Sequence, residues 1–261
     1  MRWGSYVAVG DSFTEGLDDP HPDGVGYRGW ADLVAGRLAA EAARADFGYA
    51  NLAIRGRLFD RIIREQVPLA LAMRPDLVSF AAGGNDVLRR SFDAVGLVAR
   101  FDATVASLRA TGADVVLFRF ADVMARLPGQ RLIAPRVTLL NRAIGETADR
   151  HGATLVDLWA DEEFYNPRLW SSDRLHMSAH GHRRVAAHVL AALGVSPHPE
   201  WLAAPTRPAP RPWVAARGAD LMWAGQHLAP WIKRRLMGRS SGDRVVAKRP
   251  TLGPVDWVSR S

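Results

Sequence analysis

The feature that most constrains the fold is a regular alternation of short apolar runs with longer stretches of helical periodicity. Apolar runs of strand length occur near residues 6–9, 48–53, 76–82, 114–120 and 153–157. Strands that alternate with helices pair in parallel through right-handed crossovers. The sequence therefore predicts an α/β fold, a three-layer α/β/α sandwich with about five parallel strands.

The last quarter of the chain differs from the rest in composition. Basic and acidic residues balance across residues 1–196, so residues 197–261 carry the whole net charge of +7. Six of the 16 prolines lie in residues 197–212, which predicts a semi-rigid linker. Beyond the linker, apolar residues recur at helical spacing, and Pro230 divides them into two short helices. We expect a body of residues 1–196, followed by a Pro-rich linker and a Trp- and Arg-rich helical tail that packs on the body.

Composition also restricts the environment of the protein. The sequence is 48% hydrophobic and 23% charged, which is typical of soluble globular proteins. The absence of Cys excludes disulfides and thiolate metal sites, and fits a reducing compartment. Residues 1–5 lead directly into the first strand and leave no room for a signal segment, and no apolar run approaches the ~18 residues of a membrane span. We expect a cytoplasmic protein.

The first strand leads to a hydroxyl group. The apolar run of residues 6–9 stops at Gly10, and Ser12 follows two residues later. In an open α/β sheet this position is the carboxyl edge, where ligands bind. Asp11 and Ser12 could instead serve only to cap a following helix, and this segment alone leaves the two interpretations open.

Three further polar features follow later in the chain. Gly56 comes shortly after Asn51 at the end of the second strand, Asn85 lies in the Gly-Gly-Asn-Asp segment that ends the third strand, and Asp173 precedes His176 by three residues. The carboxyl ends of parallel strands share one edge of a sheet, so the features at the strand ends can converge there.

These residue types suit acyl transfer. A serine hydroxyl is a weak nucleophile until a neighbouring base removes its proton, and a histidine oriented by a carboxylate is a suitable base. The oxyanion that forms needs hydrogen-bond donors already in place. Backbone N–H groups at Ser12 and Gly56 and the side-chain amide of Asn85 could supply three.

Together, the four segments resemble the sequence blocks of the GDSL/SGNH hydrolase family. Gly10-Asp11-Ser12-Phe13, Asn51 to Gly56, residues 83–86 and Asp173-x-x-His176 occur in the order of that family. The resemblance covers about residues 5–193 and implies a flavodoxin-like sandwich. The sequence departs from the family pattern at Phe13, where the family has Leu, and in its long basic tail.

The resemblance implies a role for each matching residue. Ser12 resembles the nucleophile, His176 the base and Asp173 the acid that orients it, while Ser12, Gly56 and Asn85 resemble the oxyanion-hole positions. Asp11 and Asp86 are secondary candidates for substrate binding, although we favour a capping role for Asp86 at the next helix. The resemblance implies no cofactor.

Other polar residues receive structural interpretations. Asp157 ends a strand and could belong to a different triad, but structural hydrogen bonding is favoured. His180, His182 and His188 lie on or near one helix, yet no carboxylate pattern accompanies them, so we expect no metal site. Gly83-Gly84 lacks the Lys-Ser/Thr of a phosphate loop, which argues against nucleotide binding.

The sequence thus predicts a serine esterase or acyl hydrolase that acts on a small ester through an acyl-enzyme on Ser12. An acyltransferase that uses the same site is the alternative within enzymes. A different class of function is docking to an anionic membrane surface through residues 213–239, where five basic residues accompany tryptophans. We favour the simpler interpretation, in which the tryptophans pack the tail on the body, and expect no specific nucleic-acid partner. The sequence does not indicate an oligomeric state.

Overall fold

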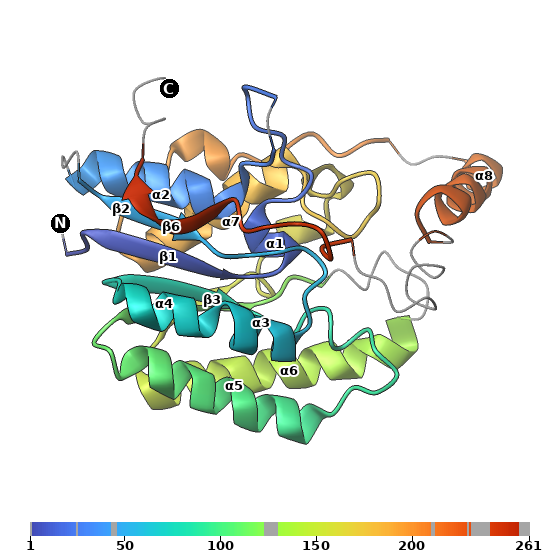
Figure 1. Ribbon diagram of the computed structural model, residues 1–261. Coiled ribbons are helices and arrows are strands. Elements are labelled where there is room, and N and C mark those ends of the chain that lie inside the picture. The colour runs from blue at the N-terminus through green and yellow to red at the C-terminus, as the bar shows by residue number, and fades with distance from the viewer. Residues whose placement is uncertain are drawn as a thin grey trace.

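The computed structural model describes residues 2–24, 26–42, 46–122, 130–209, 212–228, 230 and 241–255. One six-stranded sheet organises these residues, with the strand order β5-β4-β3-β1-β2-β6 (Figure 1). The strands are β1 (Ser5–Gly10), β2 (Gly48–Asn51), β3 (Leu77–Ala81), β4 (Asp114–Arg119), β5 (Thr154–Asp157) and β6 (Arg249–Pro254). The first five are parallel to one another, and β6 runs antiparallel to β2 at the edge.

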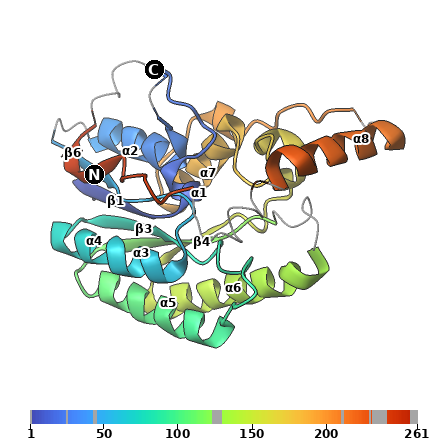
Figure 2. The same ribbon diagram turned by 45° about the vertical axis from the view of Figure 1, so that its right-hand side comes forward.

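Helices cover both faces of the sheet and complete a three-layer sandwich (Figure 1). On one face lie α1 (Ser12–Glu15), α2 (Gly29–Ala42) and α7 (Ala179–Ala192). On the other lie α3 (Phe59–Glu65), α4 (Val67–Met73), α5 (Ala94–Arg109) and α6 (Gln130–His151). A further helix, α8 (Trp213–Trp223), continues into a turn of π-helix over Ala224–Leu228 and lies at the edge of the molecule, away from the sheet (Figure 2).

The central strand β1 shows why the core has two halves. Successive side chains of a strand point to opposite faces, so Tyr6 and Ala8 pack in the layer with α2 and α7. Val7 and Val9 pack in the other layer, with α3 to α6. All four side chains are buried, as expected for a parallel strand covered by helices on both faces.

The predicted α/β sandwich with five parallel strands is confirmed, and its order is the flavodoxin-like one with β6 added. The sequence predicts one helix over residues 59–73, and the structure divides it into α3 and α4 at Gln66. The buried Gln66 side chain hydrogen bonds both the N–H and the C=O of Gly10, each at 2.9 Å, and so fixes the end of β1. The sequence also predicts a helix from Pro135 to Arg150, whereas α6 begins at Gln130 and contains that proline.

The tail differs most from expectation. The last 20 residues show no periodicity in the sequence, yet residues 249–254 form β6 and so belong to the sheet of the body. The second helix predicted beyond Pro230 lies outside the described residues. The sequence also predicts a polar connection from Ala121 to Arg131, of which residues 123–129 lie outside the described residues. Over the described ranges, no helix has both the length and the apolar character needed to cross a membrane.

Candidate active site

Ser12 lies where β1 turns into α1. Asp11 is the N-cap of this short helix, and its carboxylate accepts a hydrogen bond of 3.1 Å from the Phe13 N–H. The turn needs glycine at position 10, because a Cβ there would lie 2.4 Å from the Thr14 hydroxyl and 2.8 Å from the Ala81 carbonyl. The two interpretations of this segment, a helix cap and a hydroxyl at the edge of the sheet, therefore both hold. Asp11 caps the helix, and Ser12 is its first residue.

The structure brings Ser12, His176 and Asp173 together. His176 Nε2 lies 3.1 Å from Ser12 Oγ, and His176 Nδ1 lies 2.5 Å from Asp173 Oδ2. The other carboxylate oxygen of Asp173 accepts hydrogen bonds from the N–H groups of Leu175 and His176 and from the Ser171 hydroxyl. These local bonds fix the carboxylate, which in turn orients the imidazole toward the serine.

Electrostatics favour a charged Asp173 and a protonatable His176. Burial alone would raise the pKa of Asp173, but the hydrogen bond and charge of His176 hold it well below its usual range. Burial alone would lower the pKa of His176, but Asp173, assisted by Asp18 and Asp11, raises it above its usual value of 6.5. An imidazole in this setting can accept the proton of Ser12, and the imidazolium that forms is stabilised by Asp173.

Two of the predicted oxyanion donors are backbone N–H groups, and of their residues Ser12 lines the cavity whereas Gly56 does not. In the part of the chain that the structure describes, neither the Ser12 N–H nor the Gly56 N–H donates to a protein acceptor. Gly56 has a φ of 70°, a backbone conformation that residues other than glycine rarely adopt. Both groups can thus serve an oxyanion at no cost in existing hydrogen bonds.

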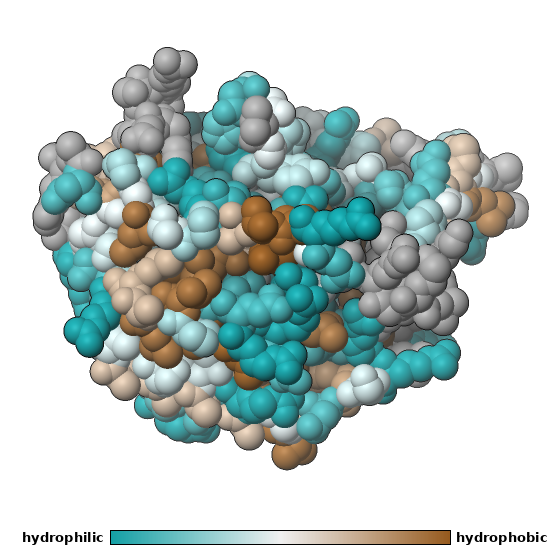
Figure 3. Space-filling view, viewed as in Figure 1, coloured by the Kyte–Doolittle hydropathy of each residue, from teal (hydrophilic) through white to brown (hydrophobic). Residues whose placement is uncertain are grey.

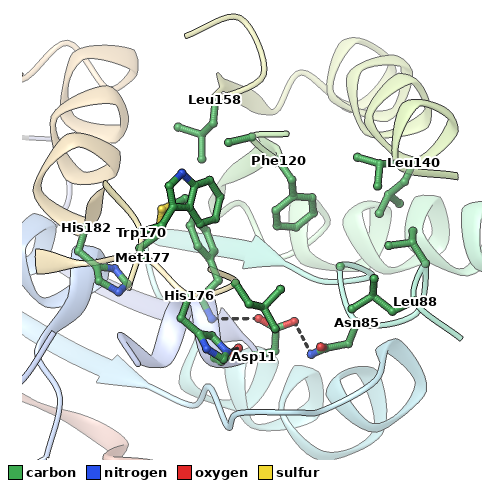
Figure 4. Close-up of a pocket in the computed structure, with 17 residues that line it drawn as sticks. Asp11, Asn85, Leu88, Phe120, Leu140, Leu158, Trp170, His176, Met177 and His182 are labelled. Atoms are coloured by element: carbon green, nitrogen blue, oxygen red, sulfur yellow. Dashed lines mark hydrogen bonds between the residues drawn. The ribbon is translucent and has the colours of Figure 1, made fainter. Parts of the chain in front are cut away.

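The Asn85 amide, in contrast, already has partners. Its Nδ2 donates to Asp11 Oδ2 at 2.9 Å and to the Arg57 carbonyl at 3.1 Å, which uses both of its protons. Figure 4 shows Asp11 between His176 and Asn85. Burial raises the pKa of Asp11 to about 6. Asn85 therefore lies at the site, but it must release one partner before it can bind an oxyanion.

A cavity of about 120 Å³ opens beside Ser12 and His176. Its far wall consists of aliphatic and aromatic side chains, several of which point into the cavity in Figure 4. The apolar lining residues are Phe13, Val87, Leu88, Phe120, Ala121, Val137, Leu140, Leu158, Trp170, Leu175 and Met177. Apart from His182, which lies beside Trp170 and Met177, the polar side chains are at the end that holds Ser12, His176, Asp11 and Asn85. The cavity can therefore hold an apolar group whose reacting atom lies at the serine.

Two other predicted carboxylates have structural partners. Asp86 accepts a hydrogen bond of 2.9 Å from the Phe59 N–H at the start of α3, and it does not line the cavity. It therefore caps a helix earlier in the chain, not the next one as expected. Asp157 pairs with Arg119 at 2.9 Å and accepts from the Ala160 N–H, which agrees with the structural interpretation.

His182 has hydrogen-bond partners of its own and, in the described ranges, belongs to no cluster of possible metal ligands. His182 is buried, accepts from the Trp30 N–H and contacts the Leu17 carbonyl, and burial lowers its pKa to about 4. Among the described residues, only Asp18, Asp173 and His176 approach closely enough to share a metal ion. Two of the three are already joined by the hydrogen bond that orients His176.

Sequence reasoning missed several contacts that support the site. Gln66 holds Gly10, and the Trp223 indole N–H of α8 donates to the Asp173 carbonyl at 3.1 Å. Arg174 stacks over the same indole and pairs with Asp220 at 2.8 Å, so α8 packs on the loop that carries Asp173 and His176. These partners are far apart in the sequence and belong to no local motif, so no signal in the sequence links them.

Comparisons with known proteins agree with the fold. The chain resembles the structures of TesA (26% identity, TM-score 0.57, covering 72% of this chain and 97% of the other) and of LAE5, an alpha/beta hydrolase enzyme from the metagenome of Lake Arreo (23%, 0.58, 73% and 94%). It also resembles Axe2, an acetylxylan esterase from Geobacillus stearothermophilus (20%, 0.58, 74% and 94%). No curated protein matches. Residues 8–184 match the GDSL-like Lipase/Acylhydrolase family, and the chain belongs to that family of ester hydrolases.

Proposed function

We propose that the protein is a serine esterase that cleaves carboxylic esters through an acyl-enzyme on Ser12. The observation that carries the proposal is the continuous hydrogen-bonded series Ser12–His176–Asp173, with distances of 3.1 and 2.5 Å, at the mouth of an apolar cavity. A nucleophile, a base and an orienting carboxylate in this relation are the parts that acyl transfer requires.

Each residue has a defined step in this mechanism. Ser12 Oγ attacks the ester carbonyl carbon while His176 Nε2 takes its proton, and the N–H groups of Ser12 and Gly56 bind the resulting oxyanion. The leaving alkoxide takes the proton from His176 as the carbon–oxygen bond breaks. Water, deprotonated by the same imidazole, then attacks the acyl-enzyme and releases the acid. Asn85 joins the oxyanion hole when its bond to Asp11 opens.

The cavity supports an ester with an apolar acyl group. Apolar side chains form nearly all of the wall beyond Ser12, and a cavity of about 120 Å³ can hold a short hydrocarbon chain. A sugar in the same place would leave its hydroxyls without partners, which is costly for buried polar groups. We therefore place the acyl chain in the cavity and the alcohol portion toward solvent.

A panel of p-nitrophenyl esters tests the proposal. We expect kcat/KM to rise from acetate to butyrate or hexanoate, as methylene groups fill the cavity, and to fall for much longer chains. Ser12→Ala should lower turnover at least about 10⁴-fold while leaving the circular dichroism spectrum unchanged. Turnover retained in a folded Ser12→Ala variant would exclude Ser12 as the nucleophile, and a preference for acetylated sugars would exclude the apolar acyl group.

An additional role in docking to anionic membranes is favoured by α8. Leu221 and Met222 are 76% and 65% exposed on this helix, and Figure 3 shows hydrophobic colour where α8 reaches the surface. Apolar side chains on a helix in a basic segment are typical of interfacial binding. Residues 229 and 231–239 of the proposed segment lie outside the described residues. We expect the protein to pellet with anionic vesicles and the Leu221→Ser/Met222→Ser variant to remain in solution; equal pelleting of both would refute the role.

A further inference from the structure

The end of the chain returns to the active site. Residues 241–254, here called the C-terminal strap, cross the end of α1 and then form β6 beside β2 (Figure 1). The family match ends at residue 184, so the strap lies outside the part of the chain that identifies the family. Two groups of contacts join the strap to the segments that carry the proposed oxyanion donors.

The first group of contacts centres on Lys248. Its ammonium group donates to the carbonyls of Glu15 and Arg28, each at 2.6 Å, and of Tyr27 at 3.1 Å. It also forms an ion pair with the carboxylate of Asp32, which is buried. Glu15 is the last residue of α1, the helix that begins at Ser12. A lysine ammonium has three donors, so this pocket of acceptors occupies all of them.

A buried network of hydrogen bonds also connects Asp32, the ion-pair partner of Lys248, to α1. The Tyr49 hydroxyl donates to the other oxygen of Asp32 at 2.7 Å and accepts from Asn51 Nδ2 at 3.0 Å. Asn51 Nδ2 also donates to the Thr14 carbonyl at 3.0 Å. The last two carbonyls of α1, which the helix itself leaves unsatisfied, are thus held by Asn51 and by Lys248.

The second group of contacts holds the segment that contains Gly56. Gly242 of the strap packs so closely on the Arg55 carbonyl that a Cβ would lie 2.0 Å from it. The carboxylate of Glu15 accepts a hydrogen bond of 2.7 Å from the Arg55 N–H and pairs with the Arg55 guanidinium. The strap therefore touches both α1 and the Gly56 segment, and Glu15 joins those two to each other.

We propose that Lys248 is a positioning residue for ester hydrolysis. By fixing the end of α1 it sets the direction of the helix that carries Ser12 and keeps the N–H of Ser12 in register with the N–H of Gly56. The inference rests on the proposed function of Ser12. It assigns part of the catalytic geometry to the tail, which the family match does not include.

Lys248→Met tests the proposal, because methionine keeps an unbranched side chain but has no donor. Arg244→Met is the matched control: Arg244 lies in the same strap and is exposed. With a short p-nitrophenyl ester, we expect Lys248→Met to lower kcat about 100-fold and to change KM less than about twofold, because a misplaced oxyanion donor acts in the transition state. We expect Arg244→Met to leave both constants unchanged.

Assays run well below the thermal midpoint of each variant, measured by circular dichroism, separate positioning from loss of folded protein. If Lys248→Met does not fold, Tyr49→Phe provides the test, with an expected fall in kcat of about tenfold at constant KM. A folded Lys248→Met variant with wild-type kcat would overturn the positioning role, provided that Ser12→Ala is inactive. Where Tyr49→Phe is the variant used, wild-type kcat in that variant would overturn it in the same way. Turnover that survives in Ser12→Ala refutes the proposed function instead.

Discussion

Two aspartate–histidine pairs flank helix α7, and only one of them faces the cavity. Asp173 and His176 lie 2.5 Å apart just before the helix, and Asp161 and His188 lie 2.7 Å apart near its other end. Hydrogen bonds hold the pKa of both carboxylates below the usual range against the opposing effect of burial. By the chemistry of the pair alone, the two would be hard to distinguish.

The surroundings of the two pairs differ. Asp161 also binds the Arg184 guanidinium and the Glu163 N–H, so its charge is shared among structural partners. His188 Nε2 faces that carboxylate, whereas His176 uses Nδ1 for Asp173 and turns Nε2 to Ser12. An aspartate–histidine pair becomes a candidate catalytic pair when its second ring nitrogen faces a nucleophile. The pair at Asp161 joins α7 to the preceding loop instead.

The largest difference is expected on removal of each imidazole. His176→Ala should lower kcat about 10⁴- to 10⁶-fold, because Ser12 loses its base. His188→Ala should leave kcat within about twofold and lower the free energy of unfolding by about 1 kcal/mol, the value of one hydrogen bond. Ester hydrolysis and urea denaturation of both variants measure the two effects. Loss of turnover in a folded His188→Ala variant would break the comparison.

Substitution of the two carboxylates, Asp173 and Asp161, should change kcat by nearly as different amounts. Asp173→Asn should lower kcat about 10⁴-fold, since the amide no longer holds His176 in the required tautomer. Asp161→Asn should leave kcat unchanged and lower the free energy of unfolding by about 2 kcal/mol, because it loses charge-assisted bonds to Arg184 and His188. Steady-state kinetics with thermal denaturation separates these outcomes. Equal losses of kcat in the two variants would remove the distinction between the pairs.

The activity of the enzyme should depend on pH through His176. Neutral His176 is the active form, so kcat/KM should rise with pH through a midpoint above 6.5, the usual pKa of histidine. Because the pKa of folded His176 is raised, its contribution to stability is complete below the pKa of the unfolded state and is lost as pH rises through the folded value. Activity should therefore rise, and the stability advantage over His176→Ala should fall, over the same pH window.

Substitution of Asp173 and of Asp161 should affect the midpoint of the pH profile of kcat/KM differently. Asp173→Asn should shift it to lower pH, because Asp173 is the largest contribution that raises the pKa of His176, and Asp161→Asn should leave it in place. A pH profile of kcat/KM for each variant gives the answer. A shift in Asp161→Asn as large as that in Asp173→Asn would contradict the assignment of the two pairs.

The smallest expected effect concerns Asp18. Its carboxylate lies 3.8 Å from His176 Nδ1 and adds a weaker attraction than Asp173. Asp18→Asn should shift the midpoint of the pH profile in the same direction as Asp173→Asn but by less, with kcat within about threefold, since Asp18 does not orient the ring. A loss of kcat comparable to that of Asp173→Asn would mean that Asp18 is the orienting acid.

The parts of the fold and site that the sequence predicted are those with local signals. Apolar runs predicted the five parallel strands, and the order of the segments predicted that Ser12, Asn85 and His176 would lie at one cavity. Each of these segments follows a strand or precedes a helix, so sheet topology alone brings them to one edge.

The contacts that could not be predicted are long-range and made by single side chains. Strand β6 contains Pro250 and Pro254, which an edge strand tolerates but which hide the strand pattern. Lys248 binds α1 from 233 positions away along the chain, and Gln66 interrupts an otherwise continuous helical pattern to bind Gly10. Such contacts depend on the assembled sheet, so no window of sequence contains both partners.

Covalent labelling tests whether Ser12 is the nucleophile. The protein would be treated with diethyl p-nitrophenyl phosphate, which phosphorylates an activated serine, and then digested and mapped by mass spectrometry. We expect one diethylphosphoryl group on the peptide containing Ser12, formed in proportion to the loss of esterase activity and absent in His176→Ala. Loss of activity with the label on a different residue would contradict it.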